Sequence, residues 1–194
     1  MVSYMDVLTI LLVFFVAMAA KSVVPKKPAA AAPAVSTPPA LAPARPGLEA
    51  IRKQFIEQGL DARADLRIEQ TGLVVSLPQA ILFRPGQDRV QAAALPMVSK
   101  VAAVLERIPN RVSIVGHADT VPIHNRRFRN NWELAGARGL ELLDLFAARY
   151  GIAESRLSTA SYGSVAPSRS NDTADGRAQN RRVEILILDA DAPR

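Results

Sequence analysis

The sequence has no cysteine, only two histidines and few aromatic residues, which make up 5% of its 194 positions. Without cysteine, the chain can form neither disulfides nor thiolate metal sites, and His117 and His124 alone cannot make a histidine-rich one. The net charge of +6 suits an anionic neighbour such as cell wall or lipid head groups. Because the basic residues are scattered and stacking aromatics are scarce, nucleic acid is not expected as a partner. No catalytic triad, acid pair or phosphate loop stands out, so we expect neither an enzyme nor a cofactor.

One long apolar run is present, from Val7 to Ala20. At 1.5 Å per residue, a helix of about 20 residues crosses a bilayer, so we predict a transmembrane helix over residues 1–22. Asp6 stands at the head of this run. A carboxylate at the centre of a membrane helix costs about 2.5–3.5 kcal/mol, and such groups bind ions, transfer protons or pair with partner helices. Two alternatives stay open: a cleaved signal peptide, because residues 17–19 resemble a cleavage site, and a helix-capping role for Asp6.

The basic residues near this run all follow it, at Lys21, Lys26 and Lys27. The positive-inside rule would therefore place the C-terminal side in the cytoplasm. We expect instead that the natural reading frame continues upstream of Met1 with Lys or Arg near the helix, and that the rest of the chain lies in the periplasm.

Residues 23–47 consist almost wholly of alanine and proline. The prolines interrupt any helix that the alanines could begin, so this segment is predicted to be an extended, flexible linker. In the polyproline II conformation such a segment reaches at most about 75 Å.

Residues 48–190 have the patterns of one folded domain. Strands and helices alternate along it, which predicts an α/β two-layer domain with helices on one face of a mixed sheet. The expected helices cover about 48–58, 96–108 and 132–150, and the expected strands cover 66–70, 73–77, 112–116, 157–162 and 182–188.

Several stretches together resemble a known family. They are VSYMD (2–6), GHADTVPI (116–123), NWELAGARG (131–139), RLSTASYG (156–163) and NDTADGRAQNRRVEI (171–185). The last four resemble the OmpA-like peptidoglycan-binding domain, and the set as a whole resembles the MotB family of ion-driven motor stator proteins. Ala118, Ala135 and Gly139 replace the Thr, Ser and Ala usual in that family, and all are small. The family also has a plug helix after its membrane span, which here is either absent or displaced to about 48–58.

The resemblance implies a wall-binding site. Diaminopimelate-type stem peptides of peptidoglycan present a carboxylate beside an ammonium, and the family binds them with the residues that correspond to Asp119 and Arg138. A guanidinium binds a carboxylate bidentately, and Asp119 follows a strand, where binding residues commonly lie. Asn131 and Leu134 are expected to line the same pocket, although Asn131 could equally be a helix N-cap. For four nearby residues we expect structural roles around a turn at 175–176 and a strand start: Arg177, Asn180, Arg181 and Arg182.

The resemblance further implies a stator B-type subunit of a flagellar motor, with Asp6 as its ion-binding carboxylate. Such subunits are single-pass inner-membrane homodimers that work with a MotA-like multi-span partner and anchor it to peptidoglycan. Two alternatives remain. One is a passive envelope protein that tethers the membrane to the wall, and the other is a stator-like complex that drives a non-flagellar system. The pattern is compatible with either H⁺ or Na⁺ as the coupling ion.

Overall fold

The computed structural model describes residue 11 and residues 46–189. Asp6, nearly all of the predicted membrane helix and the predicted linker up to residue 45 lie outside the described residues. Within the described part, no helix is long and apolar enough to span a membrane. The chain divides into two units, Met1–Pro39 and Ala40–Arg194, and the fold below belongs to the second.

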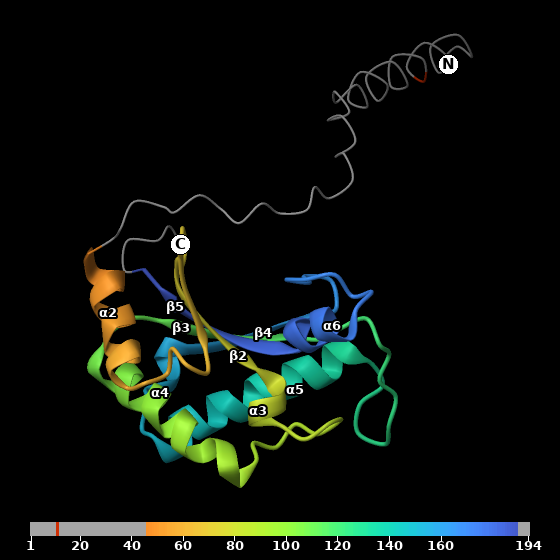
Figure 1. Cartoon of the computed structure of the whole chain (residues 1–194), viewed down its shortest axis with the longest axis horizontal. Helices are drawn as coiled ribbons and strands as arrows, with labels where there is room; N and C mark the ends of the chain where they lie inside the picture. The colour runs from red at the N-terminus through yellow and green to blue at the C-terminus, as the bar shows by residue number, and fades with distance from the viewer. Residues whose placement is uncertain (1–10, 12–45, 190–194) are drawn as a thin grey trace, which may run out of the picture. The chain divides into compact units, whose positions relative to one another are not determined.

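A five-stranded mixed sheet forms the centre of this unit (Figure 1). The strand order is β1-β2-β5-β3-β4, in which β3 and β4 run parallel and all other neighbours run antiparallel. The strands are β1 (Asp65–Glu69), β2 (Gly72–Pro78), β3 (Val112–His117), β4 (Leu157–Gly163) and β5 (Arg182–Leu188). The mixed sheet predicted from the sequence is therefore confirmed.

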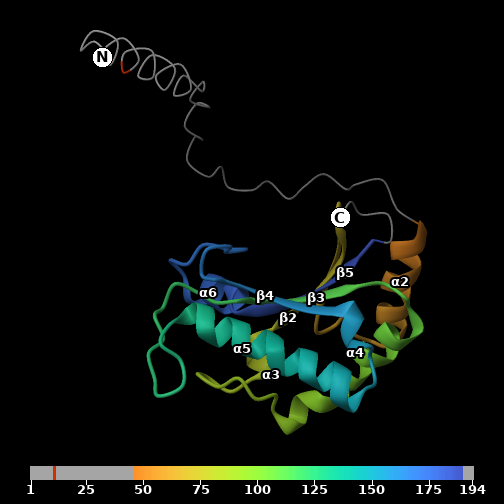
Figure 2. The same cartoon turned by 180° about the vertical axis from the view of Figure 1, so that it is seen from behind.

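Helices cover one face of the sheet. Figures 1 and 2 show α4 and α5 on the same side of the strands, and α5 contacts β3 and β4. The helices are α2 (Pro46–Glu57), α3 (Gln79–Leu82), α4 (Leu95–Arg107), α5 (Asn131–Asp144) and α6 (Ala174–Asn180). Two short 3-10 turns lie at Ala92–Ala94 and Glu154–Arg156, and a π-helical turn at Leu145–Arg149 extends α5.

The core lies between these helices and the sheet. Alternate residues of β5 point into it, and Val183, Ile185 and Ile187 are fully buried. Helix α2 also buries its apolar face, including Phe55, so this segment is an integral part of the domain. Ile56, which the sequence pattern placed on the same face, is 40% exposed.

Two short helices were not predicted. The turn expected around Asp175 and Gly176 is helix α6, whose N-cap Thr173 accepts a hydrogen bond from the backbone N–H of Gly176 at 3.0 Å. Helix α3 directly follows β2. Both helices are too short to show a 3.6-residue apolar repeat, which is the signal that sequence analysis depends on.

Helix α5 packs against β3 at backbone distance. A Cβ atom added at Gly116 would lie 2.1 Å from the carbonyl oxygen of Ala135. A Cβ added at Gly139 would lie 2.4 Å from the Thr159 Oγ1. The absence of side chains at both positions lets the helix lie directly on β3 and β4, which fixes its N-terminal end beside the loop that leaves β3.

We predict opposite effects for two glycine substitutions. Gly116→Ala should destabilise the domain by about 3 kcal/mol, because its Cβ overlaps backbone atoms that cannot move independently. Gly136→Ala should leave stability unchanged or raise it by up to about 1 kcal/mol, because its Cβ only touches Ser161 at 3.6 Å and alanine favours helix. Urea denaturation followed by circular dichroism measures both. Equal stability of the two variants would contradict the backbone contact.

Candidate functional site

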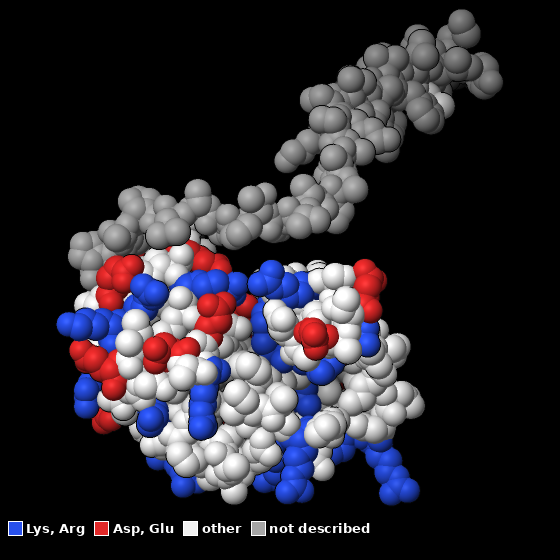
Figure 3. Space-filling model, viewed as in Figure 1, with Lys and Arg blue, Asp and Glu red and all other residues white. Residues whose placement is uncertain are grey.

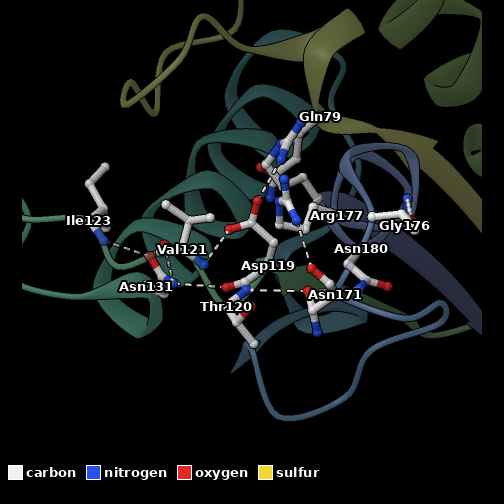
Figure 4. A network of polar contacts seen from close by, with 12 residues as sticks. Gln79, Asp119, Thr120, Val121, Ile123, Asn131, Asn171, Gly176, Arg177 and Asn180 are labelled. Carbon is white, nitrogen blue, oxygen red and sulfur yellow. Dashed lines mark hydrogen bonds and ion pairs between the residues drawn. The ribbon is translucent and has the colours of Figure 1, made fainter.

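Asp119 lies in the loop that follows β3, and this residue is only 5% exposed. Its Oδ1 accepts a hydrogen bond from the backbone N–H of Val121 at 3.1 Å. Its Oδ2 forms an ion pair with the Nη1 of Arg181 at 2.5 Å. Figure 4 shows the carboxylate pointing inward toward Gln79 and away from the loop edge. Both carboxylate oxygens therefore have a partner within the domain.

Arg138, the second predicted site residue, extends from α5 and is also 5% exposed. Its guanidinium donates to the side-chain oxygen of Gln79, to the carbonyl of Gln87 at 2.8 Å and to the carbonyl of Arg84 at 3.4 Å. It also lies over the ring of Phe83, 5.1 Å from the centroid. Arg138 thus ties α5 to the segment that follows α3.

The structure shows no direct ion pair between Asp119 and Arg138 among the described residues. Arg181 interacts with both residues: it forms the ion pair with Asp119, and its positive charge lowers the pKa of Arg138. Burial lowers the pKa of Arg138 to about 10; the carboxylate of Asp88 opposes this shift and the charge of Arg181 adds to it. Arg138 remains charged at neutral pH, and the Arg181 side chain, at 44% exposure, is the accessible guanidinium.

Gln79 is the bridging residue that sequence analysis missed. It is 3% exposed, and its amide nitrogen donates to the carbonyl of His117 at 2.5 Å while its amide oxygen accepts from Arg138. Its backbone N–H donates to the carbonyl of Arg181 at 2.9 Å. One buried amide therefore sets the relative positions of β3, α5 and the start of β5. A polar residue directly after an apolar strand was the available signal.

Asn131 braces the loop after Asp119 and is not the N-cap of α5. The cap is Asn130, whose Oδ1 accepts from the backbone N–H of Glu133 at 3.0 Å. The Nδ2 of Asn131 donates to the carbonyls of Asp119 and Val121, both at 2.9 Å, and its Oδ1 accepts from Ile123. The capping alternative for Asn131 is therefore wrong.

Leu134, the remaining predicted pocket residue, is buried at 6% exposure on α5 and offers a ligand little surface.

Residues near α6 support the same loop from the other side. The Oδ1 of Asn171 accepts from the backbone N–H of Thr120 at 3.3 Å and from the Nδ2 of Asn180 at 3.0 Å (Figure 4). Arg177 donates to the carbonyl of Asn171 at 2.8 Å. Arg177 and Asn180 thus have structural roles, and the ion pair of Arg181 with Asp119 is likewise a contact within the domain.

An open hollow of about 270 Å³ adjoins this loop. Trp132, at 48% exposure, forms part of its wall, and most of the other side chains around it are polar. Its lining residues are Thr120, Pro122, Ile123, Arg129, Asn130, Asn131, Trp132 and Ser164. Within residues 46–189, no cluster of three or more His, Asp and Glu side chains could hold a metal ion.

A polar cluster lies on the face of the sheet that is opposite to helices α4 and α5, and it includes the end of β3, the strand that leads to Asp119. His117, the last residue of β3, stacks on Tyr162 with ring centroids 5.4 Å apart. The carboxylate of Glu184 lies 3.3 Å from the His117 Nε2, 2.8 Å from Arg182 and 3.2 Å from Arg67. Burial favours the neutral carboxyl, but the neighbouring imidazole and the Arg182 guanidinium outweigh it and lower the pKa of Glu184 to about 2.

Comparison with known proteins identifies the class. Residues 82–181, more than half of the chain, match the OmpA family, so the chain belongs to that family.

Within this class the chain is similar to proteins named Motility protein B. It is 28% identical to the Helicobacter pylori protein over 96% of this chain and 84% of that protein. It is 30% identical to the Bacillus subtilis protein over 71% of this chain, but spans only 53% of that relative's length.

Solved structures agree with the fold. The periplasmic domain of Helicobacter pylori MotB superposes with a TM-score of 0.60 at 28% identity, covering 66% of this chain and 83% of that domain. The cell wall anchor of the T6SS from Pseudomonas aeruginosa gives a TM-score of 0.66 at 29% identity, covering 71% and 96%.

The low pKa of Glu184 predicts a specific pH dependence. Because its folded pKa of about 2 lies below the ordinary 4.5, Glu184 stabilises the fold above about pH 5, and this contribution disappears as the pH falls toward 2. After allowance for solvent screening, it amounts to about 2 kcal/mol at neutral pH. Glu184→Gln should therefore be less stable than the parent at pH 7, and the difference should shrink by pH 3. Urea denaturation of both proteins at each pH tests this, and an equal difference at the two pH values would contradict it.

Proposed function

We propose that the chain is the wall-anchoring B-type subunit of an ion-driven stator. Its OmpA-family domain would bind peptidoglycan in the periplasm, while Asp6 would be the ion-binding carboxylate of a single inner-membrane helix. The subunit would work as a homodimer with a MotA-like multi-span partner. The observation that carries this proposal is the extent of the match to Helicobacter pylori Motility protein B. It covers 96% of this chain, so it continues beyond the folded domain into the N-terminal part.

The charges around Asp119 support the wall-binding part of the proposal. A stem-peptide centre of the diaminopimelate type offers an ammonium and a carboxylate. The ammonium would replace Arg181 on the Asp119 carboxylate, and the released guanidinium would bind the ligand carboxylate bidentately. One internal ion pair is thereby exchanged for two with the ligand. Arg138 would add its charge from beneath while holding the surrounding segments in place.

We predict that this exchange is necessary for wall binding. Asp119→Asn and Arg181→Gln should each lower the affinity of the detergent-solubilised full chain for purified peptidoglycan, measured by sedimentation, by about 30-fold or more. Loss of one member of an ion pair that the bound ligand buries costs about 2–5 kcal/mol. Arg138→Ala should also lose binding, together with stability, because three acceptors then lack their donor.

The matched control is Arg107→Gln, which removes an exposed charge at the end of α4. Undiminished sedimentation of both the Asp119 and the Arg181 variants would exclude this site.

A second candidate is a passive cell wall anchor that moves no ions. It is favoured by the similarity to the cell wall anchor of the T6SS, which this chain covers over 96% of that structure. Both candidates use the same wall site. They differ at Asp6, which a passive anchor does not need.

The Asp6→Asn variant separates the two candidates. Asparagine keeps the shape of the side chain but cannot change charge, so this variant should bind wall and partner normally while ion-coupled work is abolished. Asp6→Glu should retain partial activity at most. Ion flux and motor torque, measured in cells that express the multi-span partner, report the result. Flux that depends on Asp6 without motility would indicate a non-flagellar system. Full flux with Asn would exclude Asp6 as the ion-binding carboxylate, and no flux or torque in the parent would leave only the passive anchor.

A further inference from the structure

Two neighbouring loops carry a group of arginines whose charges the wall site does not use. Residues 84–91 follow α3, and residues 124–129 lie in the second half of the loop between β3 and α5. The loops are joined by an ion pair of 2.7 Å between Arg127 and Asp88, and by a hydrogen bond of 3.3 Å from Asn125 to the carbonyl of Gly86.

The second loop has a defined shape. The side-chain oxygen of Asn125 accepts from the backbone N–H groups of Arg127 and Phe128, both at 2.8 Å. The backbone N–H of Asn125 donates to the carbonyl of Phe128 at 2.9 Å. Phe128 is 6% exposed and anchors the turn, with the Arg127 guanidinium 5.3 Å from its ring centroid. The turn therefore presents its outer residues from a fixed backbone.

Three exposed arginines in these loops have no neutralising partner. The side chains of Arg84, Arg89 and Arg126 make no hydrogen bond or ion pair with the residues that the structure describes, and we name these three the arginine patch. The carboxylates of Asp88 and Glu141 contact these loops, and neither pairs with the patch: Asp88 is paired with Arg127, and Glu141 accepts from the backbone N–H of Val90 at 3.4 Å. Figure 3 shows basic and no acidic side chains along the lower edge of the domain, where Figure 1 places these loops.

We propose that the arginine patch is a second contact with peptidoglycan, and that it binds free carboxylates of stem peptides next to the one held at Asp119. This inference rests on the proposed function. The wall polymer repeats its carboxylates, and guanidinium groups match carboxylates in geometry. The loop that begins with Asp119 also carries Arg126, so one polymer can meet both contacts.

The contact differs physically from the Asp119 site. Exposed ion pairs are each worth less than about a factor of five, and salt screens them with a Debye length of about 10 Å at 0.1 M. The patch therefore adds affinity at low ionic strength and little at high ionic strength.

The test compares two double variants of the detergent-solubilised full chain. Arg89→Gln with Arg126→Gln removes two patch charges and no described contact. Arg107→Gln with Arg111→Gln removes two exposed charges near the opposite end of β3, so the two double variants have the same net charge. At about 20 mM salt the patch variant should sediment with peptidoglycan about 3- to 10-fold more weakly than the parent, and within twofold of it at about 0.5 M salt. The control variant should match the parent throughout.

A soluble probe separates this inference from the proposed function. Polyglutamate should bind the parent and the Asp119→Asn variant at low salt, but the patch variant several-fold more weakly. If the Asp119→Asn variant no longer sediments with peptidoglycan but binds polyglutamate normally, the result supports both the Asp119 site and the arginine patch. The inference is overturned if the patch variant binds peptidoglycan as well as the parent does, or if the control variant loses as much affinity as the patch variant. It is also overturned if the affinity lost by the patch variant does not depend on salt, or if the parent binds anionic lipid vesicles but not polyglutamate. Failure of the parent to bind peptidoglycan would overturn the proposed function as well.

Discussion

The buried guanidinium of Arg138 is the group on which the arrangement of the site depends. A charge at 5% exposure needs acceptors in fixed positions, because an unpaired buried charge costs several kcal/mol. The acceptors come from Gln79 and from two carbonyls of the segment that follows α3. Gln79 is in turn bonded to the carbonyl of His117, two residues before Asp119. Satisfying one charge therefore positions α5, the loop after β3 and the start of β5 together.

The two arginines near Asp119 therefore have different roles: Arg138 supports the surrounding segments, and Arg181 is the one that a ligand can reach. Arg138 is enclosed, whereas Arg181 is half exposed and already holds Asp119. An internal ion pair in a ligand site keeps its charges satisfied when the ligand is absent, so the carboxylate stays in place without collapsing the loop. At the proposed wall site, a ligand would therefore have to offer both charges at once. A lone ammonium would displace Arg181 and leave it without a carboxylate, which would be the physical basis for selecting a zwitterion.

Most of the fold, and part of the site, could be predicted from the sequence. The strand over 182–188 was predicted with its observed bounds because apolar residues alternate along it, and the buried stripe of α4 followed from helical spacing. The contact of Arg181 with Asp119 could not be predicted, since it depends on β5 lying beside β3, which are far apart in sequence. Gln79 was missed for the same reason, because its partners come from three separate segments. Local patterns specify elements, and long-range pairing specifies which polar groups meet.

The central claim is that Asp119 and Arg181 recognise a zwitterionic stem-peptide centre. Calorimetric titration of the full chain with two soluble stem peptides tests this most directly. One peptide carries diaminopimelate and the other carries lysine at the same position, which keeps the ammonium but lacks the second carboxylate. The account predicts that the diaminopimelate peptide binds at least about tenfold more tightly, because only it satisfies Arg181 after the exchange. Equal affinity for the two peptides would contradict it.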